Sequence, residues 1–198
     1  MKEMVLIITA GFLNLDNVSA FQFLVSRPSF VGTVIGYFYG YMIEGFLIGI
    51  LLELVILDFT PVGGVTIPNG TVAAAISVLL FAKTNPYLAF FLGLVAGEGY
   101  SYMEKYMRAW RNVFNAFGEN MIERFDFGFS KLIILSLSLE LLIFSSYCFV
   151  SFHILSYIAM KLNSDYILKV SKIALIGTVF ITLTSLYFKF RTQVSKND

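Results

Sequence analysis

The chain has 198 residues, of which 58% are hydrophobic and 14% are charged; its formal net charge is +1 and its mean hydropathy is +0.79. Soluble domains usually contain about 45–50% apolar and about 25% charged residues, so this composition excludes an ordinary soluble domain and indicates an integral membrane protein. The small net charge excludes a strongly basic nucleic-acid-binding protein and an acidic tail.

The first apolar segment covers residues 4–15, and Asp16 ends it. It is too short to span a bilayer, because a hydrocarbon core of about 30 Å requires about 20 helical residues. Pro28 disfavours helical geometry at Arg27, so a break or a new helix start is expected there. We therefore expect a short or re-entrant helix in this region. A signal peptide is disfavoured, because Lys2 is offset by Glu3 and no clean cleavage site follows.

A series of glycines follows at close to a four-residue step: Gly32, Gly36, Gly40, Gly45 and Gly49. Residues four apart share one face of a helix, and glycine lets two helix backbones approach closely in lipid, so ordinary helix packing is the simplest interpretation. Glu53 continues the same step and would place a carboxyl at the end of this face. Glu44 lies half a turn away on a continuous helix, so the two acids are not expected to form a catalytic pair.

The uncharged segment 59–82 contains five residues that disfavour a single straight helix: Pro61, Gly63, Gly64, Pro68 and Gly70. Broken backbone at membrane depth survives only where protein buries it or water lines it, and interrupted segments of this kind indicate transporter binding sites. A re-entrant site and an ordinary loop between two spans both fit this pattern.

Residues 86–97 form another apolar segment, after which the pattern becomes that of an amphipathic helix. Apolar residues recur at helical spacing, and polar residues fill the other side: Met103, Tyr106, Met107, Trp110, Val113, Phe114, Phe117 and Met121 against Lys105, Arg108, Arg111, Asn115, Glu119 and Glu123. Such a helix is expected to lie in the membrane interface, with Trp110 at the level of the lipid head groups.

The C-terminal part contains two further apolar segments, 132–160 and 173–188. Glu140 and His153 lie in the first, but helical spacing separates them, and a single histidine cannot form a usual metal site. Cys148 is expected to be a small buried residue. Basic residues in 105–131 and in the tail place both in the cytoplasm by the positive-inside rule, although basic residues between residues 161 and 172 oppose this.

No phosphate-binding glycine loop, nucleophile elbow or Cys/His cluster occurs, so an enzyme with its own chemistry is disfavoured and neither a cofactor nor a metal is expected. Glu53, Asp58 and His153 are not placed as an acid–base pair by helical spacing. The sequence instead predicts an all-α, polytopic helical membrane protein with broken or re-entrant helices near residues 59–82.

Four stretches of the first half resemble the enzyme IIC membrane component of the mannose/fructose/sorbose family of the bacterial phosphotransferase system. They agree in order and spacing over about sixty residues: Ala20-Phe21-Gln22-Phe23 with Ser26-Arg27-Pro28, then Gly32 to Gly40, then Gly45-Phe46-Leu47-Ile48-Gly49 with Leu52-Glu53-Leu54, and then Pro61 to Asn69. Residues 98–126 also resemble the polar linker helix of that family. The resemblance suggests a membrane unit at 1–99, a linker helix at 100–130 and a shortened two-helix membrane unit at 131–198.

The resemblance implies a sugar permease subunit of the bacterial inner membrane that works together with a IID membrane subunit. In that family, soluble IIA and IIB components relay a phosphoryl group, and IIB phosphorylates the arriving hexose. The subunit itself is then a transporter component rather than the kinase, and the C-terminus is expected on the cytoplasmic side.

The resemblance also assigns substrate-binding roles. Glu53 matches the family's glutamate and is expected to accept hydrogen bonds from sugar hydroxyls; the alternative is a structural hydrogen bond to broken backbone. Asn69 and Thr66 are expected to line the re-entrant tip. Gln22 and Arg27 match positions near the entrance, although Arg27 fits an interfacial anchor equally well.

Other matching positions have a structural role or depart from the family pattern. Gly63, Gly64 and Pro68 are expected to shape the backbone. Tyr41 and Asn69 stand where the family usually has aspartate, and Ser26 stands where histidine is common. The second half is also shorter than is usual in the family. The alternative reading is therefore a degenerate IIC homologue that serves as a scaffold or senses sugar without transporting it.

Overall fold

The computed structural model describes residues 2–18, 23–58, 67–125, 129–162 and 164–194. In these ranges the chain is helical, without strands, and the predicted all-α fold is confirmed. The helices are α1 (Lys2–Val18), α2 (Pro28–Tyr39), α3 (Met42–Asp58), α4 (Gly70–Phe81), α5 (Pro86–Phe125), α6 (Phe129–Leu162) and α7 (Asp165–Val194).

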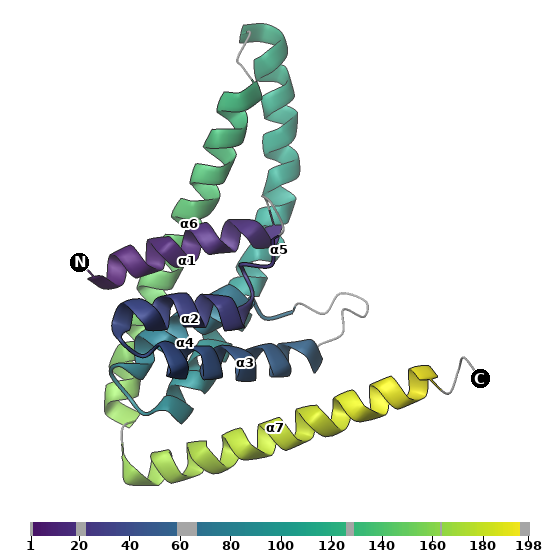
Figure 1. Ribbon diagram of the computed structural model, residues 1–198. Coiled ribbons are helices and arrows are strands. Elements are labelled where there is room, and N and C mark those ends of the chain that lie inside the picture. Colours follow the sequence, from purple (N-terminus) through teal and green to yellow (C-terminus); the bar gives the residue numbers. More distant parts are fainter. Residues whose placement is uncertain (1, 19–22, 59–66, 126–128, 163, 195–198) are drawn as a thin grey trace.

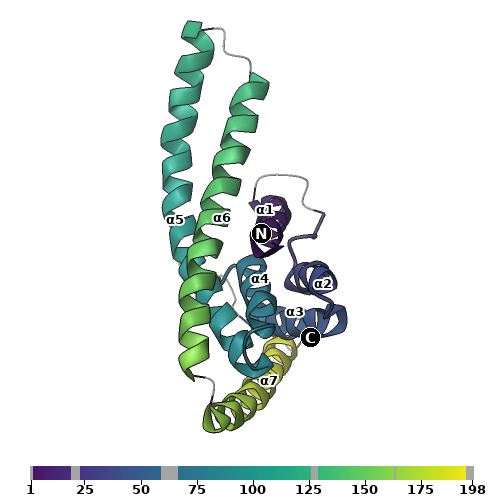
Figure 2. The ribbon, with the colours of Figure 1, turned by 90° about the vertical axis from the view of Figure 1, so that its left-hand side faces the viewer.

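The helices run in two main directions (Figures 1 and 2). The axes of α1, α2, α3 and α7 have roughly the same orientation, with α2 and α3 antiparallel to each other. α5 and α6 form a long hairpin that crosses these helices and extends beyond the rest of the molecule. α5 continues without a break from Pro86 to Phe125, so the expected boundary between residues 99 and 100 lies inside one helix.

The centre of the fold is α4. Every residue from Thr71 to Leu80 is buried, and α4 contacts α1, α2, α3, α5 and α6. Small residues allow this packing on the side of α5: a Cβ on Gly97 would lie 3.0 Å from the Cβ of Ala73, and a Cβ on Gly93 would also collide with α4. Because α4 has 12 residues, it is too short to span a bilayer.

The glycine series was expected to form one continuous helical face, but it is divided between two helices. Gly40 has a left-handed backbone (φ 87°) and ends α2, and α3 starts two residues later. The chain therefore reverses, and the glycines of α2 face those of α3: Gly32 opposes Gly45, and Gly49 opposes the start of α2 at Pro28. The expected role in close helix packing is confirmed, but it joins two consecutive helices that fold back on each other.

Within the described residues, two helical segments are long and apolar enough to cross a membrane, 130–162 in α6 and 165–191 in α7. Only 17% and 11% of their most apolar windows are buried inside the protein, so most of their apolar side chains face outward. Their axes run across one another (Figure 1). Cys148 on α6 is fully buried, as expected.

Candidate functional site

The site is built around Glu53, on α3. One oxygen of its carboxylate accepts a hydrogen bond from the Arg27 guanidinium at 2.7 Å, and the other accepts from the Ser29 hydroxyl at 2.7 Å. The side chain of Glu53 is 20% exposed and that of Arg27 is 52% exposed. Two of the residues predicted from the sequence are thus brought together, with one carboxylate edge held by an ion pair.

Local structure before α2 places Arg27 and Ser29. The buried Asp16 carboxylate accepts hydrogen bonds from the backbone N–H groups of Phe23 (2.6 Å) and Ser26 (3.4 Å), which fixes the turn that ends at Arg27. Pro28 then occupies the first position of α2, where its fixed backbone angle and missing N–H suit a helix start. Ser29 follows in the first turn of that helix.

Close contact between α2 and α3 brings these groups to Glu53. A Cβ on Gly49 would lie 2.6 Å from the Cα of Ser29, closer than real side chains approach. Gly49 is one helical turn before Glu53, on the same face of α3. The absent side chain at Gly49 therefore lets the start of α2 pack directly against the turn that carries the carboxylate.

A second polar cluster surrounds Asn69, which is 3% exposed. Its side-chain oxygen accepts from the N–H of Val72 at 3.0 Å and so caps the start of α4, while its amide nitrogen donates to the side-chain oxygen of Asn14 at 3.1 Å. Its backbone N–H donates to the carbonyl of Gly97 at 3.0 Å. Pro68, beside it, is also buried. Asn69 thereby joins α1, α4 and α5.

The two clusters are neighbours through the turn before α2. The Thr71 hydroxyl donates to the Ser26 carbonyl at 2.8 Å, and a Cβ on Gly70 would lie 2.6 Å from the ring of Pro28. The first residues of α2 and of α4 therefore converge on one region. Helix starts carry a partial positive charge, which favours the nearby carboxylate of Glu53 and groups of partial negative charge.

This arrangement suits recognition of hydroxyl groups. A carboxylate has about four lone-pair positions, and Arg27 and Ser29 use one on each oxygen of Glu53. A sugar hydroxyl can donate to a remaining lone pair and accept from the half-exposed guanidinium. The cluster therefore offers hydrogen-bond acceptors and donors side by side for a hydroxyl-bearing ligand.

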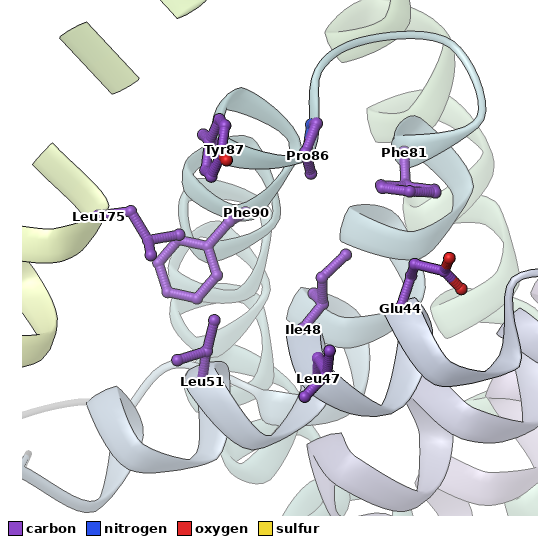
Figure 3. A pocket seen from close by; sticks show the side chains of 9 residues that line it. All are labelled: Glu44, Leu47, Ile48, Leu51, Phe81, Pro86, Tyr87, Phe90 and Leu175. Atoms are coloured by element: carbon purple, nitrogen blue, oxygen red, sulfur yellow. The ribbon is translucent and has the colours of Figure 1, made fainter. Parts of the chain in front are cut away.

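The other acids and the histidine lie elsewhere. Glu44 is on the rim of a separate pocket of about 350 Å³, and Figure 3 shows its carboxylate turned away from Phe90 and Leu175. The remaining lining is apolar and comes from α3, α4, α5 and α7. His153 is exposed and bonds to the carbonyl of Phe149 at 2.9 Å. Among the described residues, no three His, Cys, Asp or Glu side chains are grouped as metal ligands.

Four of the predicted residues, Gln22, Gly63, Gly64 and Thr66, lie outside the described part of the chain. Four others belong to the two clusters although the sequence analysis did not select them: Asn14, Asp16, Ser29 and Thr71. A sequence signal existed for Ser29, which follows the Pro28 helix start directly. None existed for Asn14, whose contact joins segments 55 residues apart.

Comparison with known proteins agrees with this fold. The family model of the PTS system sorbose-specific IIC component matches residues 1–181. A solved structure described as "Structure of membrane protein" is similar with a TM-score of 0.69 and 20% sequence identity, over 95% of this chain and 79% of that one. This likeness concerns the fold alone. No curated protein matches the sequence significantly. Because the family model covers most of its length, the chain belongs to the family of PTS system sorbose-specific IIC components, which are membrane-embedded sugar permease subunits.

Proposed function

We propose that this subunit translocates a hexose across the bacterial inner membrane together with a IID subunit, coupled to phosphorylation by IIB. The observation that carries the proposal is the Arg27–Glu53–Ser29 cluster at the contact of α2 and α3. It offers acceptor and donor groups side by side, in a chain whose family supplies the membrane component of sugar uptake.

In this proposal Glu53 is the principal sugar contact. Its carboxylate accepts hydrogen bonds from hydroxyls, and Arg27 both fixes the carboxylate and donates to a hydroxyl oxygen. Phosphoryl transfer belongs to IIB, which receives its phosphoryl group from IIA, so the subunit needs no catalytic residue of its own. Gln22 and Thr66 remain proposed contacts, and Gly63 and Gly64 remain proposed backbone-shaping residues.

The contacts of Asn69 favour a mainly structural role over direct contact with sugar. Both ends of its side-chain amide bind protein groups, Val72 on one side and Asn14 on the other. One amide N–H and one oxygen lone pair remain, so contact with sugar is compatible with this geometry. The larger contribution proposed for Asn69 and Pro68 is to hold the start of α4 against α1 and α5, beside the Glu53 cluster.

The alternative is a IIC homologue that serves as a scaffold or sensor without transport. Two observations favour it. Asn69, which stands where the family usually has an acid, is buried and engaged in helix capping. Tyr41, at the other such position, packs its ring edge-on against Phe81 at 5.2 Å between centroids. Glu53 is then the only carboxylate left at the three positions that the resemblance assigns to acids.

Flux measurements distinguish the two proposals. The subunit is co-expressed with its native IID partner, reconstituted in proteoliposomes and supplied with IIA, IIB and a phosphoryl donor. Saturable, phosphorylation-coupled entry of a labelled hexose is the result expected of a permease. An intact complex of the two subunits that shows no flux with any of several hexoses would contradict the permease proposal and favour the scaffold. Protease access to the tail in oriented vesicles tests the cytoplasmic C-terminus.

A further inference from the structure

The C-terminal helix binds the end of the helix that carries Glu53. Lys189 on α7 forms an ion pair with the Asp58 carboxylate, with 2.7 Å between Nζ and Oδ1, and it also donates to the Asp58 backbone carbonyl at 2.5 Å. Ser185, one turn earlier on α7, donates its hydroxyl to the same carboxylate at 2.6 Å. Three hydrogen bonds from one helix thus converge on a single residue of another.

Asp58 is the last residue of α3. The final carbonyl groups of a helix have no partner within the helix, and they carry a partial negative charge that favours a nearby cation. Lys189 supplies both a donor and a positive charge at that end. The C-terminal end of α3 is therefore capped by a side chain from α7, 131 residues further along the chain.

In the described part of the chain, α7 buries few of its residues. Only 11% of its most apolar window is buried. Near its start, Ser171 lies 3.5 Å from the side-chain oxygen of Asn85, and Leu175 lines the apolar pocket beside Leu51 and Phe90. α7 therefore runs along α3 in the same direction (Figure 1), with Leu175 near the middle of α3 and Lys189 at its end. In its second half, α7 is attached to the end of α3 by the polar contacts at Asp58.

The two sides of α3 are thus held by different elements. Asp58 lies five residues after Glu53, which on a helix is a rotation of roughly 140° and a rise of about 7.5 Å. α2 holds the Glu53 side through Arg27 and Ser29, while α7 holds the end of the helix from another side. A helix moves as a stiff rod over this length, so a shift of its end changes the position of Glu53.

We propose that Lys189 and Ser185 of α7 are positioning residues for the sugar site, acting through Asp58 on the placement of Glu53. This inference rests on the proposed function. The C-terminal helix then determines sugar affinity without contacting sugar, because it sets the orientation in which α3 presents its carboxylate to α2 and to the hydroxyl groups.

Calorimetric hexose binding to the complex with IID tests the inference, with separate readouts of affinity and of folding. Lys189→Ala is expected to raise the dissociation constant for hexose by about 3- to 30-fold, the usual range for residues that are coupled to a site without touching its ligand. The number of binding sites stays unchanged. Lys172→Ala is the matched control, because it removes the same charge from an exposed position of α7; it is expected to leave affinity within about twofold.

Two further variants separate positioning from general stability. Lys189→Arg keeps the charge and donors and is expected to retain most of the affinity. The exchange Asp58→Lys with Lys189→Asp re-forms the ion pair in reverse and is expected to recover affinity that either single change loses.

Four outcomes overturn the inference. In the first, Lys189→Ala lowers the melting temperature or the number of sites while the remaining sites bind with the original dissociation constant; Lys189 is then a structural contact only. In the second, the charge exchange recovers nothing. In the third, the unaltered complex binds no hexose, so the proposed function fails and the inference fails with it. Binding that responds to Glu53→Gln but not to Lys189→Ala refutes the inference alone.

Discussion

Gly49→Ala adds a single methyl group at the contact between α3 and the start of α2. The new Cβ would lie 2.6 Å from the Cα of Ser29, whereas ordinary van der Waals contact begins at 3.4 Å. The atom it meets belongs to the backbone, so no flexible side chain can turn aside. The start of α2 must therefore move away from α3, and ordinary van der Waals contact with Ser29 Cα requires a shift of about 0.8 Å, the difference between these two distances.

That displacement acts directly on the site. The hydrogen bond between the Ser29 hydroxyl and Glu53 measures 2.7 Å, and a shift of about 0.8 Å along it gives about 3.5 Å, where such a bond is largely lost. Overpacking typically costs about 1–3 kcal/mol, and the better helix propensity of alanine returns about 1 kcal/mol. We expect a net destabilisation of about 0–2 kcal/mol. Hexose affinity should fall about 10- to 100-fold, as for loss of one hydrogen bond to a charged group.

The assay is hexose binding by the purified complex, measured together with its melting temperature. Gly177→Ala is the matched control, because a Cβ placed there on α7 would have no atom of another described element within 4 Å. It is expected to bind normally and to be equally or slightly more stable. Gly49→Ala with unchanged stability and affinity would refute the close contact of α2 with α3 and the geometry of the site derived from it.

Two other predictions follow from named contacts. Asn69→Ala removes the cap of α4 and leaves Asn14 without its partner, so the melting temperature should fall by the equivalent of about 1–2 kcal/mol; Asn69→Asp keeps an acceptor at the helix start and should lose much less, and equal losses in the two variants would contradict the capping role. Trp110 is the chain's single tryptophan and is 75% exposed on α5; if that surface lies in the membrane interface, brominated lipids should quench its fluorescence more strongly than aqueous acrylamide does, and the reverse order would place it in water.

The helical class and the packing role of the glycines follow from composition and spacing, because both depend on local geometry. The reversal at Gly40 was not predicted, since a four-residue step on one helix looks nearly the same in sequence as two shorter series on consecutive helices. Only the left-handed backbone at Gly40 distinguishes them. The direct contact of Gly49 with the start of α2 follows from that reversal and could not be derived without it.

The same limit applies to the site: individual residues can be selected from the sequence, but the contacts between them cannot. Glu53 and Arg27 could be selected individually, Glu53 as a membrane acid that matches the family's glutamate and Arg27 as a match to a family position near the entrance. Their ion pair depends on how α2 folds back on α3, which spacing alone does not give. Asn69 was selected from the family resemblance as part of the re-entrant tip, whereas its contact with Asn14 depends on α1 and α4 meeting. The contact of Lys189 with Asp58 had no sequence signal, because 131 residues separate the partners.

The role of Glu53 as the sugar-binding carboxylate is tested by calorimetric hexose binding to the complex of this subunit with its native IID partner, before and after Glu53→Gln. The substitution keeps the size of the side chain, but it removes the charge that pairs with Arg27 and replaces one acceptor oxygen with an NH2 donor. We predict saturable binding by the unaltered complex and a loss of at least about tenfold in affinity in the variant, with an unchanged melting profile. Equal affinity in the two complexes would contradict Glu53 as the sugar-binding carboxylate.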